Sequence, residues 1–385
     1  MMNFSRVKAV ASKEWRETIR DRMFLLMAFL LPALWMVVFG YGLVLDVERV
    51  PFAVLDRDRS DLSRDYLYRF IESRYFDFRG SVSDEDEVDR LLGKTAVRVA
   101  IVIPDRFGKR LAAGEPVSVQ TVLDGTFPLH VDITKGYIIA INAAFTQERL
   151  VDYLGRTRGL SPDAARRLVQ PVSLETRYLY NEEVRSTWSM VPALIMFTLM
   201  VSAPLLTALG VVREKETGSI YNIYSSTVSR AEFLVGKLLP YFAISSINVV
   251  ILWTMAIGLF RVPFKGSFAV FFLGSLLFVL CATGIGLLVS LMVRTQMAAL
   301  IITIVLAMLP TILFSGLLVP VSSLSAGARW QAHLFPGMYY TNVVRGSFLK
   351  HLSVQAMWTD LAALAAIAAV LRLIAYGLFT KRPKV

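Results

Sequence analysis

The residue types that usually carry chemistry are few and scattered in this sequence. The single cysteine, Cys281, cannot form an intramolecular disulfide or a zinc thiolate cluster. The three histidines, His130, His333 and His351, lie far apart along the chain. His130 with Asp132 is too sparse a pair to define a metal site. We therefore expect no metal and no cysteine or histidine chemistry.

Signals for nucleotide binding and acyl transfer are missing as well. Gly236 and Lys237 lack the earlier glycine and the following Ser or Thr of a phosphate-binding loop, and no Gly-x-Ser-x-Gly elbow occurs. The apolar runs contain almost no charge, whereas ion-coupled carriers commonly need carboxylates there. We expect no catalytic residues, and any energy should come from another chain.

One polar strip, VVREKETGSIYNIYSSTVSRAEFLVGKLLP (residues 211–240), lies between two apolar runs. Ser229 and Glu232 have the spacing of a capping box, so a helix should begin at Ser229. Gly218 offers a break to the preceding helix. A short piece between two such breaks would form a rigid surface on which a partner could dock. An ordinary solvated loop is the alternative.

The elements that must position this strip are membrane-spanning helices. The chain of 385 residues is 55% hydrophobic and only 18% charged, which is too apolar for an ordinary soluble domain. Roughly 20 apolar residues are needed to cross a membrane as a helix. Six runs of this kind are present: residues 23–45, 189–212, 238–260, 268–293, 297–319 and 361–379.

The distribution of charge predicts the orientation of these spans. Residues 46–187 are nearly balanced, with 21 basic and 23 acidic groups, whereas residues 188–385 carry 14 basic and four acidic groups in short flanks. This pattern follows the positive-inside rule and argues against nucleic-acid binding. Both termini are expected in the cytosol, because residues 1–22 are basic and six crossings return Lys381, Arg382 and Lys384 to the same side.

An amphipathic helix should precede the first span. Apolar residues recur at helical spacing, and basic residues lie on the opposite side. These are Phe4, Val7, Ala11, Trp15 and Ile19 on one side and Arg6, Lys13 and Arg20 on the other. We expect residues 1–22 to lie on the inner leaflet, where they anchor the first span, contact a cytosolic partner, or both.

The hydrophilic segment 46–187 alternates strand and helix signals, which indicates an inserted α/β domain outside the cytosol. Strands are expected at residues 51–56, FDFRG, 97–103, 117–125 and 172–180. Helices are expected at residues 60–73, from Ser83, from Pro104, near 128–157 and after residues 161–163.

Two features remain near the C-terminal spans. Residues 320–358 are too polar to cross a membrane but contain aromatic groups, so we expect short re-entrant or interfacial helices at the outer surface. Arg372 interrupts the sixth run close to its cytosolic end, from which its side chain can reach the interface. A transport role for Arg372 is the alternative.

Four blocks taken in order resemble permease subunits of bacterial type-2 ABC exporters, in the drug-efflux-like branch with a large outer domain. They are LPALWMVVFGYGLVLDVERVPFAVLDRDRS, VAIVIPDRFGKRLAAGEPVSVQTVLDGTFP, the strip quoted above and FPGMYYTNVVRGSFLKHLS. The likeness spans nearly the whole chain.

This resemblance implies that residues 212–230 form a coupling segment that fits a groove on a separate ABC ATPase. ATP and Mg²⁺ would then be bound by the ATPase, with none in this chain. Carried over by position, the docking residues are Arg213, Glu214, Lys215, Glu216 and Gly218. The residues that set the returning helix are Ser229, Glu232, Gly236 and Lys237. Thr227 stands where the family often has proline.

The resemblance also implies two permease chains side by side, either identical or paralogous, with a passage lined mainly by spans two and five. The soft residues there would suit an amphiphilic cargo. They are Met190, Met196, Phe197, Met200, Met308 and Phe314. Ordinary packing between spans is the alternative for these residues.

The sequence therefore predicts an inner-membrane permease subunit that exports a hydrophobic or amphiphilic compound without covalent chemistry. Its partners would be an ATPase dimer, a second permease, the lipid bilayer and, in some systems, a periplasmic adaptor. Export of a lipid or lipid-linked glycan is one alternative. A membrane sensor or scaffold with an outer ligand-binding domain is another, and a polytopic membrane enzyme is a third.

Overall fold

The structure is a computed structural model that describes residues 3–42, 47–172, 176–219 and 226–379, without the side chain of Leu129. The chain divides into two compact units. Met1–Leu45 and Tyr178–Val385 form a helical unit, and Asp46–Arg177 form an α/β unit. The α/β unit ends before residue 187, the expected boundary, because the chain from Tyr178 onward belongs to the helical unit.

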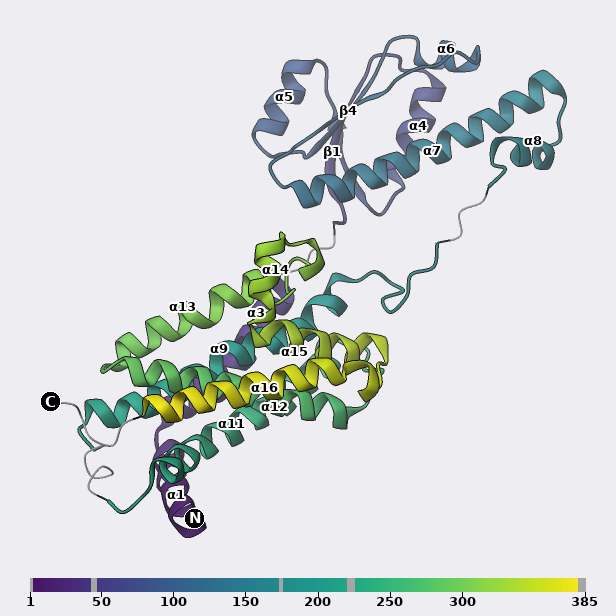
Figure 1. Cartoon of the computed structure of the whole chain (residues 1–385). Coiled ribbons are helices and arrows are strands. Elements are labelled where there is room, and N and C mark those ends of the chain that lie inside the picture. The colour runs from purple at the N-terminus through teal and green to yellow at the C-terminus, as the bar shows by residue number, and fades with distance from the viewer. Residues whose placement is uncertain (1–2, 43–46, 173–175, 220–225, 380–385) are drawn as a thin grey trace. The chain divides into compact units, whose positions relative to one another are not determined.

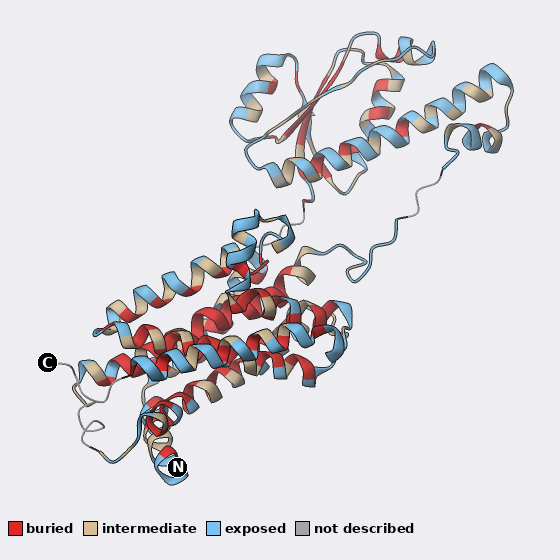
Figure 2. Cartoon of the chain, in the orientation of Figure 1, coloured by how far each residue is buried: buried red, intermediate tan, exposed pale blue. Residues whose placement is uncertain are grey.

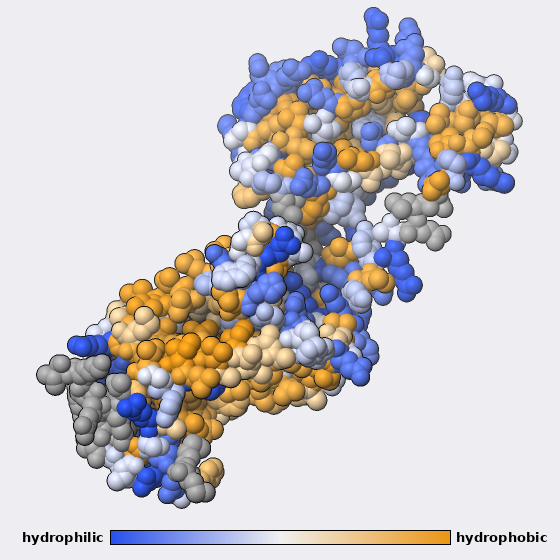
Figure 3. Space-filling model, viewed as in Figure 1, coloured by the Kyte–Doolittle hydropathy of each residue, from blue (hydrophilic) through white to orange (hydrophobic). Residues whose placement is uncertain are grey.

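Six helices in the described residues are long and apolar enough to cross a membrane, which confirms the expected number. They are Arg22–Gly42 (α2 Arg22–Leu25, the π-helix η1 Leu26–Leu30 and α3 Leu31–Gly42), α9 (Ser186–Glu216), α11 (Arg230–Gly258), α12 (Phe268–Met292), α13 (Gln296–Phe314) and α16 (Val354–Leu378). Figure 3 shows a broad hydrophobic surface over these helices. Helices α9 and α11 extend beyond the apolar runs into the polar strip, because helix ends tolerate charge that a span interior does not.

Helix α9 forms the centre of the helical unit, and Figure 2 shows it as a largely buried element. In the most apolar stretch of α9, 94% of the residues are buried. In the corresponding stretches of α13 and α16, 22% of the residues are buried. Close packing on α12 depends on Gly286, where a Cβ atom would lie 2.2 Å from the carbonyl oxygen of Pro204. The outer helices therefore keep apolar faces free, as expected for contact with lipid or a second chain.

The N-terminal helix α1 (Phe4–Arg20) confirms the expected amphipathic helix and packs on α11 (Figure 1). Its packed face carries Val7 and Glu14, which are both buried. Phe4 is 77% exposed and Ile19 is 47% exposed. The apolar side of α1 is thus only partly used inside this chain.

Short helices fill the segment between α13 and α16. They are η2 (Val321–Ser323), α14 (Ala326–His333), α15 (Pro336–Arg345) and η3 (Gly346–Lys350). In α15 the buried Tyr340 ring stacks on Phe278 with 4.2 Å between ring centroids, and its hydroxyl is 2.7 Å from that of Ser275. The short helices expected here are present, and their depth in a membrane stays a prediction.

The α/β unit contains a four-stranded mixed sheet in the order β2-β1-β3-β4. The central β1 pairs in parallel with β2 and β3, and β4 runs antiparallel to β3. The strands are β1 (Val50–Asp56), β2 (Phe76–Ser81), β3 (Val99–Ile103) and β4 (Gln120–Leu123). The helices are α4 (Asp61–Ile71), α5 (Glu85–Gly93), α6 (Phe107–Ala112), α7 (Pro128–Arg158) and α8 (Pro162–Val169).

Two expectations for this segment were wrong in detail. The helix expected from Pro104 begins only at Phe107, because Arg106 adopts a left-handed conformation with φ of 61°. A fifth strand was expected at residues 172–180. Residues 173–175 lie outside the described part of the chain, and residues 176–180 form no strand.

Candidate functional site

The N-terminal ends of α1 and α11 share one acidic side chain. Glu232 accepts hydrogen bonds from the backbone N–H of Asn3 at 2.7 Å and from that of Ser229 at 2.8 Å. The Ser229 hydroxyl in turn accepts from the backbone N–H of Glu232 at 3.3 Å, which completes the capping box expected from the sequence. Arg6 adds a bond to the carbonyl oxygen of Thr227 at 2.8 Å. The start of α11 is thus tied to α1.

Close approach of the two helices depends on a glycine. A Cβ atom on Gly236 would lie 2.8 Å from the Cβ atom of Val10 and 2.9 Å from the carbonyl oxygen of Val7. Real Cβ atoms do not approach so closely, so a larger residue would push α1 away from α11. Gly236 therefore sets the helix spacing.

Around Lys237, the next residue of α11, five side chains form a polar network that is buried except for Lys13, whose side chain is 42% exposed. The Lys237 ammonium donates to Glu14 Oε2 at 2.5 Å and lies 3.2 Å from Glu214 Oε1. Lys13 donates to the same Glu214 oxygen at 2.5 Å, and the Tyr241 hydroxyl donates to Glu14. The Lys237 side chain is 1% exposed, that of Glu14 4% and that of Glu214 6%. The buried members of the network therefore join α1, α9 and α11, and Lys13 extends it to the surface.

The electrostatics of this network reflect its burial. Burial raises the pKa of the Glu14 carboxyl, against the opposing charge and hydrogen bond of Lys237. For Lys13, partial burial acts to lower the pKa, but the hydrogen bond and charge of Glu214 outweigh it and raise the pKa. Each charge is thus held by a partner on another helix, so the three helices are coupled electrostatically.

Further contacts fix the end of α9. The Arg213 guanidinium lies 2.6 Å from Asp21, whose pKa is lowered by the Phe24 backbone N–H and by Arg213. The Lys215 ammonium donates to the carbonyl oxygen of Ser290 at 2.5 Å, at the end of α12. Gln296, at the start of α13, donates to Glu216 at 2.5 Å. The end of α9 is therefore held by α2, α12 and α13.

The end of α9 follows the sequence prediction. The helix stops at Glu216, and Gly218 takes a left-handed φ of 74°, as glycines after helix ends commonly do. The chain then enters residues 220–225, which belong to the expected coupling segment but lie outside the described residues.

The nine residues predicted for docking and return all lie at this end of the helical unit, but in different surroundings. Arg213, Glu216 and Ser229 are exposed, and Lys215 and Gly218 are half-buried. Glu214, Glu232, Gly236 and Lys237 are buried.

Glu214 therefore requires a correction. As a docking residue it would need to be exposed, yet it is only 4% exposed. Its carboxylate accepts a hydrogen bond from Lys13 and forms an ion pair with Lys237. Its role in this structure is to hold helices together.

Sequence reasoning missed the contribution of α1. Glu14 and Tyr241 were not singled out, although Glu14 lies seven residues after Val7 and four before Thr18 on the face that packs inward. A carboxylate within the packed stripe of an amphipathic helix was the available signal. Its partner, Lys237, is 223 residues away in the chain and could not be identified by spacing.

The six residues predicted for a passage differ in burial, and their place along a passage between two chains stays a prediction. Met190, Met196, Phe197 and Met200 are buried in the core around α9, whereas Met308 and Phe314 on α13 are half-buried. Access to the first four would require α9 to be uncovered.

Three glutamates at the network lie close enough together to offer oxygen ligands to a metal ion. Oxygen atoms of Glu14, Glu17 and Glu214 lie within 4.8 Å of one another. The ammonium groups of Lys13 and Lys237 already contact these carboxylates. Positive charge is thus supplied by the chain itself.

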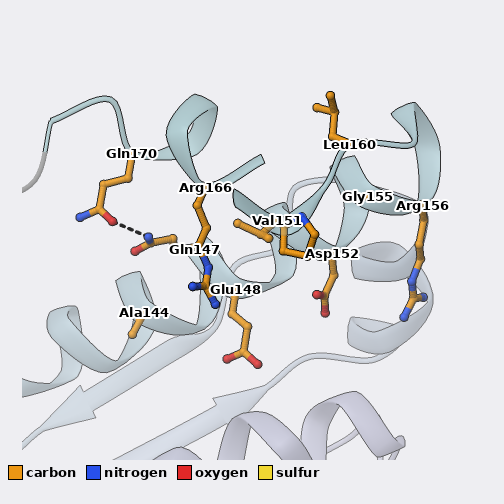
Figure 4. A pocket seen from close by; sticks show the side chains of 11 residues that line it. Ala144, Gln147, Glu148, Val151, Asp152, Gly155, Arg156, Leu160, Arg166 and Gln170 are labelled. Atoms are coloured by element: carbon orange, nitrogen blue, oxygen red, sulfur yellow. Dashed lines mark hydrogen bonds between the residues drawn. The ribbon is translucent and has the colours of Figure 1, made fainter. Parts of the chain in front are cut away.

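The α/β unit has an open, polar groove of about 810 Å³ between α7 and α8 (Figure 4). Gln147 on α7 donates to Gln170, just after α8, at 2.5 Å. Glu148, which lines the groove, lies 2.7 Å from the guanidinium of Arg69, which does not line it. The lining residues contain no nucleophile with an adjacent base, so this groove suggests no reaction.

Comparisons with known proteins give a consistent result. A family model described as ABC-2 family transporter protein matches residues 22–376. The probable multidrug ABC transporter permease YbhS of Escherichia coli K12 is 28% identical over 352 residues, covering 91% of this chain and 90% of that protein. The probable multidrug ABC transporter permease YbhR of the same strain is 24% identical over 379 residues, covering 98% and 99%. The inner membrane transport permease YhhJ is 24% identical, covering 86% and 85%.

Proposed function

This chain belongs to the ABC-2 family of transporter proteins, and from this premise we propose that it is the membrane permease subunit of an exporter driven by a separate ABC ATPase. The observation that carries the proposal is the end of the helical unit where the polar network joins α1, α9 and α11. Its exposed groups include Arg213, Glu216, Ser229 and Arg230. An ATPase dimer would bind there.

The buried network explains how force applied at this surface would reach the spans. Movement of the strip would be transmitted to α9 and α11 together, because Glu214 and Lys237 link them. On α1, Glu14 pairs with Lys237 of α11 and Lys13 pairs with Glu214 of α9. Helix α9 is the central helix of the unit, so its displacement would alter the packing of several spans at once.

The ATP and Mg²⁺ would be bound by the partner. Lys237, the lysine that follows Gly236, is 1% exposed and is engaged by Glu14, so it is not available to a nucleotide phosphate. This arrangement supports a transport subunit without catalysis of its own.

The proposed location is the bacterial inner membrane with both termini in the cytosol. Contacts support the proposed grouping of cytosolic segments. Lys215 at the end of α9 donates to the carbonyl oxygens of Ser290, near the end of α12, and of Val293, in the α12–α13 turn. The Phe233 ring on α11 stacks with that of Phe379, after α16. The α/β unit, residues 46–177, would then lie outside the cytosol, where an adaptor could reach it.

The proposed cargo is a hydrophobic or amphiphilic compound, and a second permease, identical or paralogous, would complete the passage. The names of the relatives YbhS and YbhR, which include the word multidrug, support this class of cargo. The buried methionines of α9 would line the passage only after a rearrangement that uncovers them.

Mild detergent extraction of the tagged full chain from its native host, followed by mass spectrometry of co-purifying proteins, tests the proposal. We expect a stoichiometric soluble ATPase with a phosphate-binding loop. Reproducible absence of such an ATPase would overturn the proposal in favour of a sensor or scaffold. The same experiment would identify a paralogous second permease.

Two charge reversals at exposed positions test the docking surface itself. Glu216→Lys and Arg230→Glu should each reduce ATPase recovery, because they change the charge of the surface without burying a new group. Arg329→Glu, at an exposed position on α14, is the matched control and should leave recovery unchanged. Equal recovery from all three variants would place the ATPase elsewhere.

A further inference from the structure

A lipid-sized groove runs between α11 and α16, with α12 as its floor. It has a volume of about 590 Å³ and an almost wholly apolar lining. Leu238 and Leu239 come from α11, Leu280 and Leu287 from α12, and Leu373 from α16. Helices α11 and α16 each pack on α12 but hardly touch each other, which leaves the groove open on its outer side.

The groove occupies only one half of the membrane-spanning region. Along α11 it extends from Ala231, next to the helix start, to Phe242. At a rise of 1.5 Å per residue this is roughly 16 Å, about half of a hydrocarbon core of ~30 Å. It therefore lies within the leaflet at the end of the unit where α1 is found, and its length suits a single acyl chain.

One charged residue, Arg372 on α16, lies in this apolar lining. Its only hydrogen bond among the described residues runs from Nη1 to the carbonyl oxygen of Ala368 at 3.2 Å. The ion pairs found in residues 3–42, 47–172, 176–219 and 226–379 do not include Arg372. A cation within a span is costly unless an anion or the headgroup region receives it.

A phenol lies one helical turn closer to the helix end. Tyr376 also lines the groove, four residues after Arg372 and therefore on the same face of α16. A guanidinium and a hydroxyl at this spacing can both donate hydrogen bonds to one phosphate group.

We propose that this groove binds an anionic phospholipid of the leaflet at the α1 end, which is the cytosolic leaflet in the proposed orientation. Its phosphate would be held by Arg372 and Tyr376, and one acyl chain would lie over Leu280 and Leu287. Charge complementarity favours an anionic over a zwitterionic lipid, because the latter brings its own ammonium group to a site whose described lining has a cation and no carboxylate. The described lining begins at Ala231, next to the proposed ATPase surface, but includes none of the exposed groups assigned to that surface, Arg213, Glu216, Ser229 and Arg230.

Native mass spectrometry of the purified full chain tests the proposal. The chain is equilibrated with equal amounts of phosphatidylglycerol and phosphatidylethanolamine of the same acyl composition. We expect retained phosphatidylglycerol adducts, reduced about tenfold in Arg372→Gln, because this variant loses the charge and the hydrogen bonds that hold the phosphate. Arg372→Lys should retain an intermediate level, since it keeps charge but loses the two-pronged geometry.

Two further variants separate the groove from general surface charge. Arg294→Gln, at an exposed position in the α12–α13 turn, should leave the adducts unchanged. Ala369→Trp should reduce them by filling the groove while the positive charge remains. Equal retention of both lipids, equal loss in Arg294→Gln, or no retained lipid at all would each overturn the proposal. Because no ATPase is present, the result is independent of the proposed export function.

Discussion

Ion pairs of equal length serve different purposes in the two units. In the α/β unit, Arg64 lies 2.5 Å from Asp61, and the two side chains are 59% and 97% exposed. In the helical unit, Lys237 lies 2.5 Å from Glu14, and the two side chains are 1% and 4% exposed. Judged by the distance between the charged atoms alone, the two pairs would be expected to contribute equally to stability.

The difference shows that burial, and not the length of a contact, determines what a charge pair does. An exposed pair is screened by water and contributes little to stability. A buried pair makes each partner obligatory, since removing one leaves an uncompensated charge in a medium of low polarity. The Arg64–Asp61 pair lies on a surface, whereas the buried network fixes how three helices meet.

The largest effect is expected from removing the lysine at the centre of the network. Lys237→Met would leave Glu14 and Glu214 without their shared cation, and we expect it to cost about 3–5 kcal/mol of stability. The midpoint of thermal unfolding in detergent measures this loss. The double variant Glu14→Gln/Lys237→Met should recover part of it, and an unchanged midpoint in Lys237→Met would contradict the role assigned to the network.

A smaller effect is expected where packing alone holds α1. Gly236→Val would collide with Val10 and should cost about 1–3 kcal/mol while increasing hydrogen exchange in α1. Gly377→Val is the matched control, because a Cβ atom there meets no other atom within 4 Å. If exchange in α1 rose equally in both variants, close packing at Gly236 would not be its cause.

The cap of α11 should contribute less again. Ser229→Ala removes the hydroxyl that accepts from Glu232, at an expected cost of about 1 kcal/mol. Hydrogen exchange of the first turn of α11 reports the loss, and Ser229→Thr should restore most of the protection. Equal protection in the alanine variant would show that the Glu232 bonds alone close this helix end.

The smallest effect on stability is expected from removing the exposed Arg64–Asp61 pair. Arg64→Ala in the α/β unit should change the free energy of unfolding by less than about 0.5 kcal/mol, because its partner remains hydrated. A loss comparable with that of Lys237→Met, in the same thermal measurement, would break the distinction between the two units.

The parts of the fold that could be predicted from sequence are those set by local patterns. The six spans follow from apolar runs, the breaks at Gly218 and Ser229 from residue types with a known backbone preference, and β1 and β3 from short buried runs. Spacing in the sequence is sufficient for such features, because the residues that cause them are neighbours.

The organisation of the candidate site could not be obtained in this way. The burial of Glu214 and the pairing of Glu14 with Lys237 arise from contacts between residues more than 200 positions apart. From sequence alone, a charged residue in a polar strip is predicted to be exposed, because a buried partner far away in the chain cannot be identified. The left-handed Arg106, which delays α6, likewise depends on surroundings that the local sequence does not reveal.

The carboxylate shared by the ends of α1 and α11 has a consequence for biosynthesis. Glu232 accepts a hydrogen bond from the backbone N–H of Asn3, the residue that caps α1 and lies 229 positions earlier in the chain. When Asn3 leaves the ribosome, Glu232, the acceptor for its backbone N–H, has not yet been translated. The contact between the ends of α1 and α11 can therefore form only after the third span has been synthesised, so docking of the N-terminal helix follows assembly of that span.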